Sequence, residues 1–405
     1  MTLRTIDATW PFTRDSADPL LPPPQIAEIR AAGDPVQVQM YDGTKATLFT
    51  TYDQVTEILK SANSSSDGSK PGFPYISDSA RANRGSRPTI DRLDPPEHDI
   101  QRGMLAPSFT AKRIREWRPS IEATVDRLLD TLEQKGSADD LLTEFAELVP
   151  ANVITTLLGL PFDRADFFLD RVHRWMDDRN DPADIAQAME DIKVYFGEVI
   201  DERKGSEGTD LISVLVRERL ETGQIDRNQL IITLHLLLSA GFETTANAIA
   251  LGVVALLQEP DAWHELAETD DEELIKSAVE EVLRFVSPAH QTHIRIASDP
   301  IPVGHYTIQA GEGIIATQLG ANHDPAQFSD PDRIDIHRDA RSHVAFGLGL
   351  HQCLGQALAR LELQIVFSKL SHRFPNMRLE KPVTELTYKT SSIAYTASPV
   401  PVTWL

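Results

Sequence analysis

The only cysteine among the 405 residues of this chain lies in a glycine-rich decapeptide just before an apolar helical pattern. The decapeptide, from Phe346 to Gly355, reads FGLGLHQCLG, and the helical run 356–374 follows it. Glycines permit tight turns with positive φ and let the backbone approach a flat ligand closely. The first N–H groups of the following helix point toward Cys353 and favour its thiolate form. The segment is therefore suited to present a sulfur atom to a ligand.

Three interpretations of this cysteine compete. Free cysteine is often a small buried hydrophobic residue, and taken alone Cys353 would favour that interpretation. A zinc site would use Cys353 and His351, but no second cluster in the sequence offers two more ligands. A thiolate in an apolar wall suits a soft metal, and haem iron is one candidate. The fixed spacing of glycines and phenylalanine favours the metal, because a core cysteine does not require it.

The decapeptide resembles the haem-thiolate signature of the cytochrome P450 family. It matches at every fixed position, namely Phe346, Gly347, Gly349, His351, Cys353 and Gly355. The resemblance implies that haem b (iron protoporphyrin IX) is the cofactor and that Cys353 is its proximal iron ligand. It also implies that Phe346 packs against the sulfur side of the haem and that Gly355 lies close to it.

Composition excludes several other classes of protein. The chain has 39 Lys and Arg residues against 61 Asp and Glu residues, a formal net charge of −22. This charge argues against nucleic-acid binding and against anionic membrane surfaces. Residues 1–24 lack an apolar stretch of the signal-peptide or membrane-spanning kind. A single cysteine rules out an internal disulfide, and we expect a cytoplasmic monomer.

The patterns predict a mainly helical α+β chain in one domain, residues 1–405, with small sheets. Two short strands are expected at 36–40 and 46–50, around a turn at 41–43. Helical spacing covers 121–159 and 165–200, with breaks near 136 and 180–182. Further short strands are expected at 292–297, 302–303 and 313–316. These features fit the P450 fold that the resemblance implies.

A long buried helix is predicted from Asp226 to Gln258. Asp226 followed by Gln229 is a variant capping box, and Pro260 lies just beyond the run. About 33 residues at ~1.5 Å each give a length of about 50 Å, which spans a domain. Apolar residues occur on most sides of it, as expected of a helix inside a core.

The middle of this helix, residues 240–245, has the unusual sequence AGFETT. Glycine, an acid and two threonines are poor choices for a buried helix, so either a kinked core helix or a functional element explains them. In cytochrome P450s a similar element crosses the oxygen-binding face of the haem. The resemblance implies that Ala240 and Gly241 lie against the haem and leave room for oxygen and substrate. Glu243 and Thr244 are then the catalytic pair that delivers protons.

Two further constellations follow from the resemblance. Glu281 and Arg284 form an E-x-x-R pair three residues apart, with a structural role in holding the cysteine loop. A third partner is expected after residue 330, and Arg333 is favoured over Arg338.

The haem propionates need cations, which a chain this acidic must supply locally. Each candidate cation, taken alone, is more typical of a solvated surface charge. The resemblance implies that His98, Arg102, Arg295 and His351 bind the haem propionates.

Family positions also predict a mainly apolar substrate pocket. Its residues are Phe73, Ile76, Leu237, Ala240, Val286, Ala289, His290 and Ile393. His290, with Gln291 and His293, offers unusual polar groups that either orient a substrate or face away from it. The expected substrate is a small organic molecule of the size of a secondary metabolite.

The leading functional hypothesis is a monooxygenase that uses O2 and takes electrons from NAD(P)H through a ferredoxin reductase and a ferredoxin. Hydroxylation and oxidative C–N or C–C bond formation both remain open. Arg102, Lys112, Arg113 and Arg360 form a candidate docking patch for an acidic ferredoxin, and an ordinary mixed surface is the alternative.

Three other functions compete with this hypothesis. A P450-type nitric oxide reductase is suggested by residues 10–14 and 247–253, but that branch lacks an acid where Glu243 stands. A peroxide-driven enzyme would not require the pair of Glu243 and Thr244. A non-catalytic haem sensor would have no use for a proton-delivery element.

Overall fold

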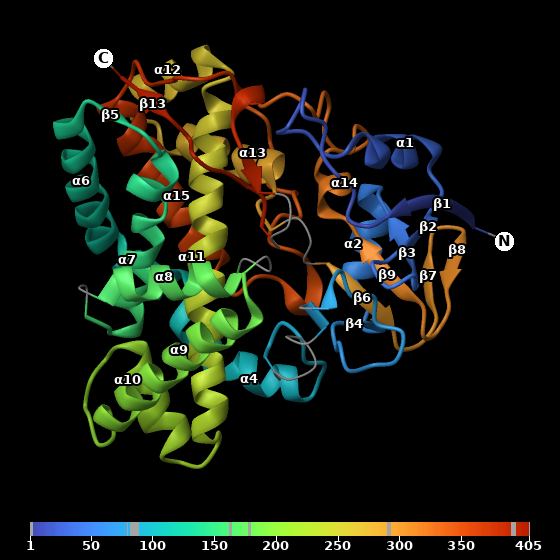
Figure 1. Ribbon diagram of the computed structural model, residues 1–405, viewed down its shortest axis with the longest axis horizontal. Coiled ribbons are helices and arrows are strands. Elements are labelled where there is room, and N and C mark those ends of the chain that lie inside the picture. Colours follow the sequence, from blue (N-terminus) through green and yellow to red (C-terminus); the bar gives the residue numbers. More distant parts are fainter. Residues whose placement is uncertain are drawn as a thin grey trace.

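The computed structural model describes residues 3–78, 80–81, 89–161, 164–176, 180–289, 293–389 and 394–404. Most of the helices gather around the long α11 (Arg227–Leu256), and most of the strands lie together on the other side of the molecule (Figure 1). A mainly helical chain with small sheets was predicted, and the structure confirms it.

Helices make up most of the described chain. They are α1 (Pro24–Ala32), α2 (Tyr52–Lys60), α4 (Glu97–Leu105), α5 (Ala111–Glu116), α6 (Arg118–Lys135), α7 (Leu148–Leu158), α8 (Ala165–Met176), α9 (Pro182–Glu202), α10 (Leu211–Leu215), α11, α12 (Pro260–Glu268), α13 (Glu272–Val286), α14 (Gln318–Asn322) and α15 (Gln356–Arg373). Short π-helical turns, Leu142–Ala146 and Val216–Leu220, precede α7 and follow α10. The predicted breaks near 136 and 180–182 both fall between helices.

The strands form one larger sheet and three small ones. The larger sheet has the order β1 (Arg4–Thr9), β2 (Val36–Gln39), β3 (Lys45–Phe49), β9 (Gly313–Ala316), β6 (Ile294–Ala297), β4 (Ser64–Ser65). The others pair β10 (Arg378–Leu379) with β13 (Val402–Thr403) and β5 (Ser137–Ala138), β11 (Tyr388–Lys389) with β12 (Thr396–Ala397), and β7 (Ile301–Val303) with β8 (Tyr306–Ile308). The predicted strands are confirmed to within two residues at each end.

The register of the larger sheet brings distant segments together. β3 and β9 pair in parallel, with Leu48 opposite Ile315, and β9 pairs with β6 in antiparallel fashion, with Ile314 opposite Arg295. The side chains of β9 are all buried, as expected of a central strand with both faces covered. This pairing fixes Arg295 on a strand in the interior of the sheet.

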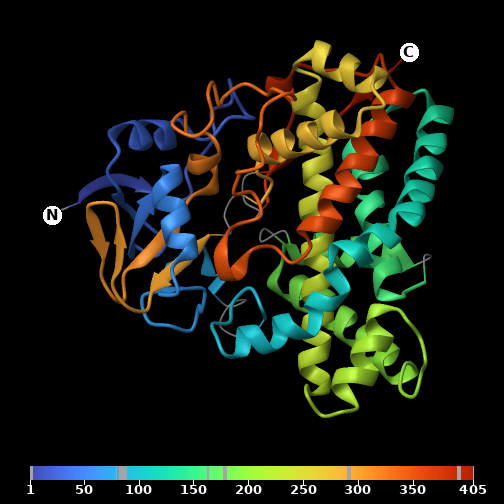
Figure 2. The same ribbon diagram turned by 180° about the vertical axis from the view of Figure 1, so that it is seen from behind.

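The long helix α11 is the centre of the helical part. The Asp226 carboxylate accepts a hydrogen bond from the backbone N–H of Gln229 at 2.8 Å, so the predicted cap is confirmed. α11 packs against α7, α9, α13 and α15, and Figure 2 shows α15 running beside it. It is long and apolar enough to cross a membrane, but 78% of its most apolar window is buried inside the molecule. That burial is typical of the core helix of a globular fold.

Candidate haem-thiolate site

The cysteine loop folds back on itself just before α15. The backbone N–H of Cys353 donates to the carbonyl of Phe346 at 2.8 Å. Gly347 and Gly349 have φ values of +67° and +73°, which glycine adopts without strain. A Cβ atom on Gly349 would lie 2.2 Å from the carbonyl oxygen of Leu59 in α2. The glycine spacing therefore serves both a tight turn and a close backbone contact.

The environment of the Cys353 sulfur balances opposing effects. The side chain is exposed on one side, yet enough protein surrounds it for burial to raise the pKa of its thiol. Backbone hydrogen bonds from Gly355 and Gln356 and the charges of Arg102 and Arg360 oppose this rise in the pKa. The pKa is still raised, whereas the helix start alone favours a lowered value.

A cationic and imidazole cluster forms beside the cysteine loop. The rings of His98 and His351 are in edge-to-face contact, with centroids 4.7 Å apart. Both ring nitrogens of His351 are buried with no hydrogen-bond partner in the described part of the chain. Burial, and then the charge of Arg295, lowers the pKa of His351 to about 4. Buried donors without acceptors favour an anionic ligand, since each unmade hydrogen bond is costly.

Three members of the predicted propionate set differ in their contacts. Arg102 in α4 donates from Nη2 to the carbonyl of Gln352 at 2.8 Å, so it braces the residue before the cysteine. His98 is buried, and its Nδ1 lies 2.9 Å from a carboxylate oxygen of Asp99. Arg295 is buried on β6 and donates to the carbonyl of Ile294. All of them adjoin the cysteine loop or the His98–His351 contact.

His293 is a site residue that sequence reasoning assigned differently. The structure places its Nε2 2.9 Å from where a Cβ of Gly347 would be, hence against the cysteine loop. Burial, then the charges of Arg295 and His351, lowers the pKa of His293 to about 3. Its position two residues before Arg295 and directly before β6 was the signal for this placement, because alternate residues of an extended segment share a face.

The centre of α11 is accessible, although the helix around it is buried. Ala240 is exposed, and Gly241, Glu243 and Thr244 are partly exposed. The hydroxyl of Thr244 donates to the carbonyl of Ala240 at 2.8 Å, as a threonine in a helix often does. A Cβ on Gly241 would lie 3.2 Å from a methyl group of Ile154 in α7. One face of an otherwise apolar core helix is thus left open and polar.

The E-x-x-R pair is completely buried, and its third partner is Arg338. Glu281 and Arg284 form two hydrogen bonds of 2.7 and 2.8 Å at zero side-chain exposure. Arg338 donates from Nε to Glu281 at 3.1 Å. The predicted Arg333 is wrong in this role: its side chain is 66% exposed and pairs with Glu259. Its backbone carbonyl alone reaches the cluster, by accepting from Arg284.

Asn322 is a structural residue that the sequence reasoning missed. Its carbonyl accepts from Arg284, and its side chain donates to the hydroxyl of Ser287, both at 2.8 Å. Its side-chain oxygen accepts the backbone N–H of Val344, just before the cysteine loop. Asn322 thereby connects the E-x-x-R helix to the cysteine loop.

The predicted pocket residues fall in two hydrophobic clusters. Leu237 and Val286 belong to the main core around α11, whereas Phe73 packs with Tyr75 and the strand β6. Ile76 and Ala289 are partly exposed, and His290 and Ile393 lie outside the described residues. The described part therefore does not bring the predicted pocket together by direct contact.

Arginines of the predicted docking patch form ion pairs within the protein. Arg360 forms a double ion pair with the buried Glu280, at 2.6 and 2.9 Å, and lies over the ring of Phe346. Arg113 pairs with Glu116 in its own short helix. Arg360 is thus a bracing residue of the cysteine loop, so it offers little charge to a partner.

These residues fit a haem group. Cys353 supplies an accessible sulfur, the accessible centre of α11 supplies a polar face, and His98, His351 and Arg295 supply donors for carboxylates. Neither a zinc site nor a core cysteine explains buried imidazole nitrogens that lack partners.

Comparisons with known proteins agree with this geometry. The family model described as "Cytochrome P450" matches residues 167–403. The chain is 38% identical to pentalenic acid synthase of Streptomyces avermitilis, over 99% of this chain and 98% of that protein. It is also 38% identical to vitamin D3 dihydroxylase of Streptomyces griseolus, over 99% of this chain and all of that protein.

Solved structures are similar over nearly the whole length. The crystal structure of mycinamicin VIII C21 methyl hydroxylase MycCI from Micromonospora griseorubida, bound to mycinamicin VIII, matches with a TM-score of 0.90 at 34% identity. That match covers 98% of this chain and all of the other. The crystal structure of GfsF matches with a TM-score of 0.93 at 36% identity, over 98% of this chain and all of that chain.

Proposed function

Because the chain belongs to the cytochrome P450 family and is therefore a haem-dependent oxidoreductase, we propose that it activates O2 to oxidise an apolar secondary metabolite. Relatives named for pentalenic acid, vitamin D3 and mycinamicin VIII support a small organic metabolite as the substrate. Hydroxylation is the reaction that we favour, because the names of two of these relatives state it. Electrons would come from NAD(P)H through a ferredoxin reductase and a ferredoxin.

The observation that carries this proposal is the accessible polar centre of α11. Bound haem supplies an iron at which O2 is reduced, with Cys353 as its ligand. The single cysteine is used by the iron, which favours noncovalent haem b. Glu243 and Thr244 would pass protons along the open face of a core helix. The hydroxyl of Thr244 donates to the carbonyl of Ala240, so its lone pairs stay free to accept a hydrogen bond from water.

The residues beside the cysteine loop would bind and orient the haem. His98, His351 and Arg295 would hold the propionates through charge-assisted hydrogen bonds. Arg102 would act mainly by fixing Gln352, because it already donates to that carbonyl. Leu237 and Val286 would line the apolar wall that excludes water from the substrate.

Turnover with a surrogate ferredoxin–reductase pair tests the proposal. Pentalenene-type terpenoids, vitamin D3 and mycinamicin-type macrolides are screened by ferric difference spectra, and compounds that shift the spectrum are then incubated with NADPH and O2. A product heavier by one oxygen atom is expected. Thr244→Ala should keep haem but lower product per NADPH about 10-fold or more, since general-acid groups contribute ~10²–10⁴ in rate. An unchanged yield in that variant would contradict the proposed role of the pair.

A nitric oxide reductase is the second candidate, and Glu243 argues against it. The test is anaerobic consumption of NO with NADH and no other protein. Rapid consumption would replace the monooxygenase proposal, whereas none is expected.

A further inference from the structure

His173 and Glu147 form an ion pair that connects the surface to the interior. His173 lies on α8, and Glu147 lies between the π-helical turn Leu142–Ala146 and α7. The Nε2 atom of His173 is 2.9 Å from a carboxylate oxygen of Glu147. The His173 side chain is 44% exposed, while that of Glu147 is only 10% exposed. A half-exposed imidazole is thereby held in a fixed orientation by a buried carboxylate.

This pair lies against the part of α11 that carries the proposed proton-delivery residues. The ring of His173 is 6.0 Å from that of Phe242, the residue before Glu243. The elements on both sides of Glu147 pack on α11 as well. His173 is therefore partly exposed and also packs beside the residue that precedes Glu243 in α11.

The charges around His173 support this geometry. The hydrogen bond from Glu147 raises the pKa of His173, burial opposes the rise, and the charge of Glu147 adds to it. Lys389 on β11 lowers this pKa, and the charge of Glu243 on α11 raises it. The contribution of Glu243 is the smallest of these, and it is consistent with the packing of His173 beside Phe242.

Other charged groups on α8 and the facing α9 are paired with one another. They form the pairs Arg171–Asp191, Arg174–Asp170 and Arg174–Asp184. The largest influences on the pKa of His173 come instead from Glu147, burial, Lys389 and Glu243.

We propose that His173 is the solvent-facing group that supplies protons to Glu243 and that Glu147 holds its ring in place. The inference rests on the proposed function, because it needs Glu243 to deliver protons during oxygen reduction. The imidazolium loses its Nδ1 proton through water to the Glu243 carboxylate, and the neutral imidazole takes a proton back from solvent. Both residues act through Glu243 and are positioning residues of the relay.

The pH dependence follows from the direction of the shift. A raised pKa keeps His173 protonated to a higher pH than an ordinary histidine, so the supply of protons extends to a higher pH as well. The supply of protons to Glu243 falls as the pH rises through the pKa of His173. Glu147→Gln removes the group that raises this pKa, so the alkaline decline should move to lower pH.

Histidine titration by NMR tests the coupling without turnover. The measurement uses the reduced, carbon monoxide-bound holoprotein, which is diamagnetic, with labelled histidine. We expect the pKa of His173 to fall in Glu147→Gln and, by a smaller amount, in Glu243→Gln. His305, which pairs with Asp34 at 2.8 Å in the sheet-rich part, is the internal reference and should not move. A His173 pKa that is the same in Glu243→Gln as in the wild type would overturn the inference.

A second measurement separates this inference from the proposed function. The substrate-free holoenzyme consumes NADPH and O2 with the surrogate redox pair, and the readout is H2O2 released per NADPH between pH 6 and 9. His173→Gln should raise this ratio about threefold and abolish its alkaline change, a modest part of the usual general-acid effect. The matched control His305→Gln should behave as the wild type.

The outcomes are distinguishable. Wild-type ratios in Glu243→Gln and Thr244→Ala would contradict the proposed function itself. Raised ratios in those two variants, with a wild-type ratio and pH profile in His173→Gln, would contradict only the supply role of His173.

Discussion

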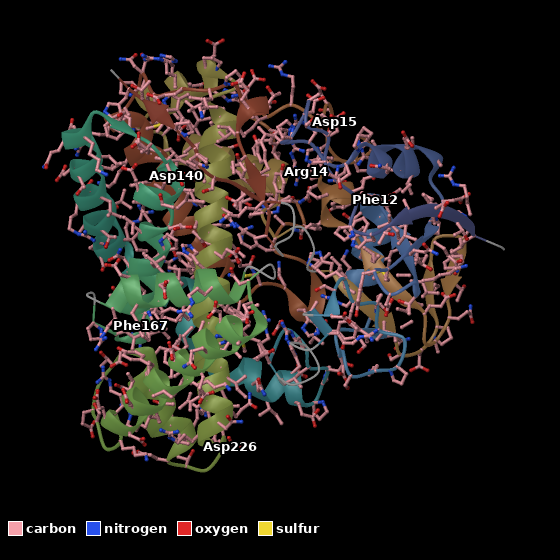
Figure 3. The ribbon with its side chains drawn as sticks, viewed as in Figure 1. Phe12, Arg14, Asp15, Asp140, Phe167 and Asp226 are labelled. Atoms are coloured by element: carbon pink, nitrogen blue, oxygen red, sulfur yellow. The ribbon has the colours of Figure 1, made fainter. Side chains whose placement is uncertain are left out.

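The two sides of the candidate haem site are held in different ways. On the cysteine side, the restraints lie at the site: Gly349 touches the backbone of α2, Arg102 holds Gln352, and Arg360 bridges Phe346 and Glu280. On the opposite side, α11 is held by its buried flanks and by the Asp226 cap at its far end, which Figure 3 labels. The centre of α11 remains accessible.

The cysteine side therefore provides rigidity, whereas the α11 side provides groups for proton exchange. The cysteine side has to keep one sulfur atom in place, which favours many short contacts that leave little freedom. The α11 side has to exchange protons, so its polar groups must stay accessible to water. Substitutions on the cysteine side should therefore change stability and haem ligation, whereas those at the centre of α11 should change oxygen chemistry and leave the fold intact.

The largest effect is expected at the sulfur itself. Cys353→Ala removes the proposed iron ligand, so the reduced, carbon monoxide-bound protein should lack the red-shifted Soret band of thiolate ligation, and monooxygenase turnover should disappear. Thr244→Ala is the comparison on the other side, and it should keep that band. A red-shifted band in Cys353→Ala would contradict the whole assignment of the site.

The buried E-x-x-R cluster should show the next largest effect, as a loss of folding free energy. Arg284→Ala breaks the buried ion pair and leaves Glu281 with hydrogen bonds from Arg338 and from the backbone N–H of Asp335, and breaking a buried pair costs about 3–5 kcal/mol. Arg338→Ala leaves that carboxylate bonded to Arg284, and loss of one charged hydrogen bond costs about 1.5–3 kcal/mol. Arg333→Ala is the matched control, because Arg333 pairs at the exposed surface. Urea unfolding of the three variants measures the order, and a larger loss in Arg333→Ala than in Arg338→Ala would contradict the structure.

The ionisation of Glu280 should make the stability of the cysteine side depend on pH in the acid range. Burial opposes the shift, but His343, whose Nε2 lies 3.1 Å from the carboxylate, and the two hydrogen bonds from Arg360 lower the pKa of Glu280 from 4.5 to about 2. A lowered pKa contributes stability above the unfolded value of 4.5, and this contribution is lost as the pH falls toward 2. Glu280→Gln should therefore cost about 3 kcal/mol at pH 7 and progressively less below pH 4.5.

Urea titrations at pH 7, 4.5 and 3 measure the difference between wild type and Glu280→Gln. Asp339→Asn is the control, because the pKa of Asp339 is also lowered to about 2 but its pair with Arg341 is exposed. Solvent screening should leave that variant close to the wild type. A pH-independent cost of Glu280→Gln would show that the lost interaction is not ionic.

Sequence reasoning predicted well those parts of the site that are local in the chain. The cap of α11, the turn at the cysteine and the Glu281–Arg284 pair each depend on residues within a few positions of one another. Periodicity and spacing carry that information directly.

Partners that are distant in the sequence could not be predicted in this way. Arg333 and Arg338 lie five residues apart at the ends of successive turns, and only the path of the backbone decides which side chain points inward to Glu281. The pair of His173 and Glu147 spans 26 positions and two helices, and neither residue is unusual in its own segment. His323 likewise bonds Asp332 and the carbonyl of Phe285, contacts that only the folded chain creates.

The smallest effect on stability is expected at the N-terminal cap of α11, on the side opposite the cysteine loop. Asp226→Ala removes the side chain that accepts the backbone N–H of Gln229 and should cost about 1 kcal/mol of stability. Because Asp226 lies at the exposed start of α11, far along the helix from Glu243, the ratio of H2O2 to NADPH should stay at the wild-type value. Asp226→Asn keeps a capping oxygen and should be nearly neutral in the same unfolding titration. A changed ratio in Asp226→Ala would mean that the end of α11 and its centre are mechanically coupled, and the separation of rigidity from chemistry would then fail on this side.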